Sequence, residues 1–235
     1  MSVVIGYVSD YFSIIMTDTR ITYGKNAEMG WNDNFEKLVS LPNMGWATGV
    51  GVFDFIHHFN RELAKIKSAS VRMMEELFEK TFEQEIDKNE SMKNHYDSTV
   101  ITCSWVGSEE NRNKFRVGLL NKQYFGNRIF ELGNNYITLL YPYDFLNDLS
   151  KVENIEKRFS MYTEFVGNFG ELLKYLLQIF AEISSNSFGV SRICDIGIQV
   201  YLDNHLYKFQ LKEDVRPLMQ AAKDGTLLNK LSVVN

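Results

Sequence analysis

The stretch SVVIGYVSDYFSIIMTDTR, residues 2–20, decides the fold of this chain. Within it, residues 3–8 and 13–17 form two runs rich in β-branched and other apolar side chains, which favour strands. Residues 9–11 between them are a short segment typical of a tight turn. The stretch therefore predicts a β-hairpin whose second strand ends at Asp18.

Strands and helices follow in blocks. After a polar loop at 24–34, two further strands are predicted at 38–41 and 45–48, joined at Pro42-Asn43. Helical spacing then predicts two amphipathic helices. The apolar face of the first is formed by Val52, Ile56, Phe59 and Leu63, and that of the second by Val71, Met74, Phe78 and either Phe82 or Ile86.

The second half of the chain also alternates blocks of strands with helices. Strands are predicted at 98–105, 114–120 and 127–132, helices at 143–150 and 165–184, a hairpin of 196–202 and 205–211 around 203–204, and a last helix at 213–222. Hairpin-linked strands imply antiparallel sheets, and paired helices imply outer layers. We therefore expect an α+β sandwich with two sheets at its centre, formed as one domain over residues 1–235.

Composition excludes several kinds of protein. The net charge of −5 gives no overall electrostatic footprint for nucleic acid or an anionic membrane, and it leaves a localised basic patch open. Cys103 and Cys194 lie in apolar runs without metal-ligand spacing, which predicts buried free thiols. His57-His58 likewise lacks further ligands at metal spacing, so we expect no metal and no cofactor. With no signal-peptide pattern and no long apolar segment, a cytoplasmic location is expected.

Ser2 follows the initiator Met1. If Met1 is removed, Ser2 becomes an N-terminal nucleophile whose own α-amino group, with a pKa of roughly 7.7–8.0, can accept the hydroxyl proton near neutral pH. The ordinary alternative is a start codon followed by a small residue.

Four segments carry a resemblance to a known family: 2–6, 14–22, 36–39 and 45–49. In their order and spacing they resemble the proteasome β-subunit family of N-terminal-nucleophile (Ntn) hydrolases, which includes the simpler proteasome-like bacterial proteases. That family opens with an N-terminal Thr and has an Asp-(Ser/Thr)-Arg-x-Thr motif sixteen residues later, which is the distance from Ser2 to the Asp of 18–22. The resemblance covers nearly the whole chain and implies a four-layer αββα sandwich.

The resemblance implies a role for each matching residue. Ser2 Oγ would attack an amide carbonyl while the Ser2 amine acts as general base. Lys37 would supply a positive charge that favours the deprotonated nucleophile, Asp18 would anchor Lys37, and Arg20 would help to fix that group of side chains. The loop before Lys37 is about three residues longer than the family pattern.

Three further residues are expected at the substrate. The backbone N–H of Gly49 would stabilise the oxyanion, because close approach to substrate tolerates little side chain. Ile21 and Thr22 would border the substrate strand. The plainer alternatives are that Asp18 and Arg20 form a turn carboxylate with a surface cation, and that the lysine is a solvated strand end.

The sequence also departs from the family. Ser in place of Thr keeps the hydroxyl but loses the methyl group that restrains χ1. The family's Gly-Ser-Gly turn is replaced by residues 140–143, Leu-Tyr-Pro-Tyr. The family's late Asp and Ser have no clear counterpart, although Ser187, Ser191 and Asp195 lie nearby.

The leading hypothesis is a proteasome-like N-terminal serine hydrolase that cleaves peptide or amide bonds through an acyl-enzyme on Ser2. A catalytically silent structural subunit or binding module on the same fold is the first alternative. An amide-bond transferase or small-molecule amidohydrolase is the second, since an amine or water can resolve the same acyl-enzyme. The resemblance also implies a homo-oligomer, such as a ring, and a possible unfoldase partner.

Overall fold

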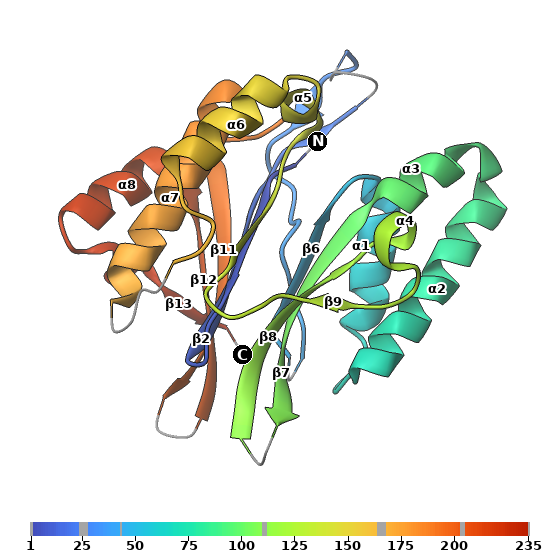
Figure 1. The fold of residues 1–235 in the computed structure, drawn as a ribbon, viewed down its shortest axis with the longest axis horizontal. Helices are drawn as coiled ribbons and strands as arrows, with labels where there is room; N and C mark the ends of the chain where they lie inside the picture. Colours follow the sequence, from blue (N-terminus) through green and yellow to red (C-terminus); the bar gives the residue numbers. More distant parts are fainter. Residues whose placement is uncertain are drawn as a thin grey trace.

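Two antiparallel sheets lie face to face between two layers of helices (Figure 1). The computed structural model describes residues 2–23, 28–42, 44–109, 112–163, 168–202 and 205–234. Within these ranges the chain forms the expected α+β, four-layer αββα sandwich.

The first sheet has six strands in the order β10-β1-β2-β11-β12-β13. They are β10 (Ile137–Leu140), β1 (Val4–Val8), β2 (Phe12–Asp18), β11 (Ile193–Leu202), β12 (His205–Asp214) and β13 (Ser232–Val234). Strand β2 lies between β1 and β11, with Thr17 opposite both Val4 and Asp195. Every residue of β1 and β2 is buried, because helices cover one face of this sheet and the other sheet covers the opposite face.

The second sheet has the order β5-β6-β7-β8-β9, and a small separate sheet pairs β3 with β4. The strands are β5 (Val39–Ser40), β6 (Trp46–Val50), β7 (Val100–Glu109), β8 (Arg112–Leu120), β9 (Phe130–Glu131), β3 (Ile21–Thr22) and β4 (Trp31–Asn32).

Each sheet carries its own helical layer (Figure 1). The second sheet is covered by α1 (Phe53–Leu63), α2 (Val71–Lys88), α3 (Lys93–Ser98) and α4 (Lys122–Phe125), with a 3₁₀ turn at Glu90–Met92. The first sheet is covered by α5 (Tyr143–Leu146), α6 (Leu149–Arg158), α7 (Phe169–Asn186) and α8 (Val215–Lys223), with a 3₁₀ turn at Leu227–Lys230.

The core is divided by these layers. One large cluster joins the first sheet to α6, α7 and α8, and another joins the second sheet to α1, α2 and α3. Between the sheets, Ile15 and Trp46 pack in a smaller apolar cluster. The Trp46 ring lies against Gly197, where a Cβ atom would come within 2.4 Å of it, so a side chain at this point would force the two sheets apart.

Several predicted boundaries were wrong. The strand expected from Ser98 begins at Val100 because α3 runs to Ser98. The helix expected at 143–150 is two helices, α5 and α6, and the strand expected at 127–132 is only the two-residue β9. The last helix starts after Asp214, whose side chain accepts a hydrogen bond from the Arg216 N–H and caps it.

Other elements were missed because their sequence signal is short. These are β3, β4, β10, β13, α3 and α4. The expected start of the helix at 165–167 and the turn at 203–204 lie outside the described residues, as does Asn43 of the turn at Pro42. Helix α7 begins at Phe169, where the Asn168 side chain accepts a hydrogen bond from the Glu171 N–H.

Candidate active site

Asp18 is the last residue of β2 and is fully buried beside the start of β1. Its Oδ1 accepts hydrogen bonds from Lys37 Nζ at 3.0 Å and from the Val3 N–H at 3.3 Å. Its Oδ2 accepts from the backbone N–H groups of Arg20 at 2.8 Å and Ser191 at 3.2 Å. Four donors thus hold this carboxylate in one position, and three of them are backbone groups fixed by the fold.

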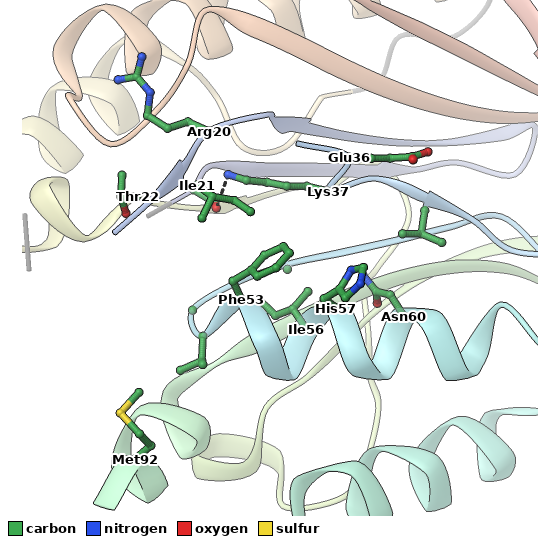
Figure 2. A pocket seen from close by; sticks show the side chains of 15 residues that line it. Arg20, Ile21, Thr22, Glu36, Lys37, Phe53, Ile56, His57, Asn60 and Met92 are labelled. Carbon is green, nitrogen blue, oxygen red and sulfur yellow. Dashed lines mark hydrogen bonds between the residues drawn. The ribbon is translucent and has the colours of Figure 1, made fainter. Parts of the chain in front are cut away.

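Lys37 joins Asp18 to Ser2. Its Nζ donates to Ser2 Oγ at 2.8 Å (Figure 2). The same Nζ also donates to Asp18 Oδ1. Burial of the ammonium lowers the pKa of Lys37, and the charge and hydrogen bond of Asp18 oppose that change. The residues predicted as nucleophile, positive charge and anchor, far apart in sequence, therefore form one hydrogen-bonded chain. This geometry disfavours the alternative of a solvated strand-end lysine, because Lys37 is only 8% exposed.

The Arg20 side chain pairs with Asp33 and not with Asp18. Its guanidinium forms a two-pronged ion pair with Asp33, at 2.6 and 2.9 Å, and donates to the Phe188 carbonyl. The side chain extends away from Lys37 (Figure 2). Arg20 therefore reaches Asp18 only through its backbone N–H, and its side chain ties the segment after β2 to two other loops.

Ser2 and Lys37 open into a cavity of about 300 Å³ between the strands and helix α1 (Figure 2). Gly49, Ile21 and Thr22, the residues expected at the substrate, all line it. The other lining residues are Arg20, Glu36, Val39, Gly51, Val52, Phe53, Ile56, His57, Asn60 and Met92. All seven predicted site residues are thus brought to one cavity or to the carboxylate behind it.

Packing between a strand and α1 also requires a small residue at Gly49. A Cβ atom there would lie 2.6 Å from the Val100 carbonyl and 3.1 Å from Ile56, so the neighbouring strand and α1 exclude a side chain. Gly51, two residues on, has φ +132°, a conformation that favours glycine, and also lines the cavity. Either backbone N–H is a candidate oxyanion donor.

Of the three residues that the sequence placed near the family's late Asp and Ser, Ser191 is the one that contacts Asp18. Its backbone N–H binds Asp18, and its hydroxyl lies 3.1 Å from the Thr19 N–H and 3.0 Å from Thr19 Oγ1. The other two candidates lie elsewhere: Ser187 donates to Asp144, and Asp195 accepts from Gln210. Ser191 precedes β11, the strand that pairs with β2, and only that pairing brings it to Asp18.

Two residues near the site, Asp33 and Asn60, were missed by sequence reasoning. Asp33 fixes Arg20, as described above, and it lies in a polar loop that contains no motif to single it out. Asn60 interrupts the apolar face of α1 four residues after Ile56. This polar residue on an apolar face is the sequence signal by which Asn60 could have been identified.

The described residues contain neither a candidate metal site nor a membrane-spanning helix. They contain no group of three or more His, Cys, Asp or Glu side chains suited to a metal ion. No helix in these ranges is long and apolar enough to cross a bilayer. Cys103 and Cys194 are free and buried, as predicted, and burial raises the pKa of Cys103 to about 12.

This chain resembles known proteins in structure and not in sequence. No family model matches the sequence, and no curated protein matches it. Among solved structures, Anbu (ancestral beta-subunit) from Yersinia bercovieri aligns with 95% of this chain and 92% of its own, with a TM-score of 0.64 and 12% identity. A Gly-1 mutant of Anbu from Hyphomicrobium sp. strain MC1 aligns over 100% of both chains, with a TM-score of 0.60 and 12% identity. This chain therefore has the proteasome-like Ntn-hydrolase fold that these Anbu structures share.

Proposed function

We propose that this chain is an N-terminal serine hydrolase that cleaves amide bonds, with peptides as the substrate class, once the residue before Ser2 has been removed. The observation that carries the proposal is the contact of 2.8 Å between Lys37 Nζ and Ser2 Oγ at the wall of a cavity. The shared fold with the Anbu structures supports it.

In the proposed acylation, Ser2 Oγ attacks the amide carbonyl carbon and its proton passes to the Ser2 α-amine. Lys37, held by Asp18, stabilises the developing negative charge on Oγ, and a backbone N–H of Gly49 or Gly51 donates to the oxyanion. The tetrahedral intermediate then collapses, the C–N bond breaks, and the leaving amine takes the proton. The acyl group remains on Ser2 as an ester.

Water completes the cycle. It attacks the ester carbonyl while the Ser2 amine accepts its proton, and collapse returns that proton to Ser2 Oγ as the carboxylic acid leaves. An amine in place of water would give transfer rather than hydrolysis, and adding amine acceptors to the assay separates the two outcomes.

The first test is intact mass followed by acyl trapping. The purified protein is expected to lack Met1 and to gain the mass of one acyl group from an activated peptide ester. The Ser2→Ala variant should gain none. Lys37→Met should trap at least about 100-fold more slowly, since it removes the charge at the nucleophile. Unchanged trapping in Ser2→Ala would refute the nucleophile.

A matched variant tests the base. Inserting Glu between Met1 and Ser2 gives an N-terminus from which Met is not removed, so the Ser2 amine stays in a peptide bond. This variant should be inactive although Lys37 and Asp18 are intact. If it is as active as the parent, the amine is not the base, and Lys37, with its lowered pKa, takes that role. If neither protein acts on any amide, the silent-subunit alternative is supported.

By the same resemblance we propose a homo-oligomeric assembly, with an unfoldase as a possible partner. Light scattering on the eluted protein tests the assembly, and a monomer at micromolar concentration would contradict it.

A further inference from the structure

The cavity beside Ser2 has two chemically different ends. Figure 2 shows Arg20 and Thr22 on one side of the view and Glu36 on the opposite side, with His57 and Asn60 on α1 lying toward the Glu36 side. Most apolar side chains of the lining come from β5, α1 and the segment before it, namely Val39, Val52, Phe53 and Ile56, and the others are Ile21 and Met92. An apolar wall thus leads from the nucleophile to a polar end.

Asn60 is the unusual residue of that end. Only 1% of it is exposed, and its Oδ1 has no hydrogen-bond partner among the described residues. Buried polar atoms are almost always paired, and an unpaired one is unfavourable. Asn60 also lines the cavity, so a group bound there can supply the missing donor.

The charges of the cavity select the kind of donor. An amide can present its oxygen or its NH₂ by rotating about χ2, so Asn60 alone accepts either type of partner. The two cations of the lining are already paired, Arg20 with Asp33 and Lys37 with Asp18. Glu36 forms no ion pair with any described residue. The charge left without a partner at this cavity is therefore negative, which favours a cation that also donates hydrogen bonds.

The shape of the cavity favours a long side chain. Its volume of about 300 Å³ is at the small end of the range for ligand sites, roughly 300–1,000 Å³. An unbranched methylene stem can pack along Val39 and Ile56 while its charged head lies at the polar end. Lysine and arginine combine such a stem with a cationic donor.

We propose that this cavity selects amide substrates whose side chain next to the cleaved bond ends in a cation, as in lysine or arginine. Asn60 Oδ1 accepts a hydrogen bond from the head group, and Glu36 provides the attracting charge. The inference rests on the proposed function, because it places the cleaved bond at Ser2.

The test compares fluorogenic peptide amides that differ only at this side chain: arginine, lysine, norleucine and glutamate. At pH 8, kcat/KM for arginine should exceed that for norleucine by roughly tenfold or more. Glu36→Gln should reduce this ratio to about threefold or less, and it is expected to fold because Glu36 is exposed. Asn60→Leu should lower the ratio further by making the polar end apolar. Glu83→Gln, an exposed carboxylate on α2, is the matched control and should leave the ratio unchanged.

A binding measurement separates the inference from the proposed function. Ser2→Ala protein should bind n-butylguanidinium more tightly than n-butanol when binding is followed by NMR, and adding Glu36→Gln should reduce the difference to about threefold or less. Binding without cleavage of any substrate would refute the hydrolase and retain the cation site. Cleavage with equal rates for arginine and norleucine would refute the cation site and retain the hydrolase.

Discussion

Asp18 and Lys37 are unequal partners, and the stability of their variants should show it. The structure gives Asp18 four hydrogen-bond donors, of which Lys37 is one. Lys37 has two acceptors, Asp18 and Ser2 Oγ. Replacing the lysine leaves a carboxylate that still accepts three backbone N–H groups. Replacing the aspartate leaves a buried ammonium with one hydroxyl and three unpaired N–H groups.

These differences set the expected magnitudes. Asp18→Ala should reduce the free energy of unfolding by about 3–5 kcal/mol, the usual cost of leaving one charge of a buried pair without its partner. Lys37→Met should cost only about 1–2 kcal/mol, because loss of the charged hydrogen bond is partly offset by no longer burying the ammonium. The double variant should be more stable than Asp18→Ala alone, since it contains no buried unpaired charge.

The effect of Asp18→Ala should also depend on pH. Burial lowers the pKa of Lys37 below its ordinary value of 10.5, so between the two values the unfolded chain binds more protons than the folded chain. Stability therefore rises with pH in that window. Loss of Asp18 removes the interactions that oppose the lowering, so the cost of the variant should be greatest near neutral pH and smaller as pH approaches 10.5.

Urea unfolding followed by tryptophan fluorescence measures these differences, with the exposed Lys157→Met as a control expected to leave the midpoint unchanged. A Lys37→Met variant less stable than Asp18→Ala would refute the reasoning. A double variant no more stable than Asp18→Ala would refute it as well.

Three further predictions concern the surroundings of the site. Burial raises the pKa of Asp195 from 3.8 to about 6, so the folded state holds its proton more tightly than the unfolded state and stability is lost as pH rises through about 6. Asp195→Asn should therefore stabilise the protein by roughly 3 kcal/mol at pH 7 and by almost nothing at pH 4 in urea unfolding; equal gains at both pH values would contradict this. Gly51→Ala should cost roughly 3 kcal/mol, because φ is +132° and the new Cβ would lie 2.8 Å from Thr99 Cα; an unchanged thermal midpoint would contradict it. Arg20→Lys should lower the stability by about 1 kcal/mol in the same assay, since lysine cannot form the two-pronged pair with Asp33. A loss of stability equal to that of Arg20→Ala would support this reasoning, because it would show that a positive charge alone is not enough. An unchanged stability of Arg20→Lys would contradict it.

The sequence by itself determined most of the longer local elements and the candidate residues of the site. Continuous apolar runs predicted β1 and β2, and helical spacing predicted α1, α2 and most of α7, because each pattern reflects burial that repeats along a short segment. The number of residues between Ser2 and Asp18 could be read directly from the sequence, since Ser2 lies just before the hairpin of β1 and β2 and Asp18 ends it. Lys37 followed from its place in the resemblance.

Tertiary structure alone decided which distant residues complete that site. Ser191 reaches Asp18 across 173 residues because β11 pairs with β2, and no periodicity within either strand specifies that pairing. Arg20 pairs with Asp33 rather than Asp18 because the carboxylate of Asp18 is already enclosed by backbone donors. Asn60 acquires its unpaired oxygen only when α1 packs over the cavity. Local sequence patterns record which face of an element is buried, whereas these contacts depend on how separate elements pack together.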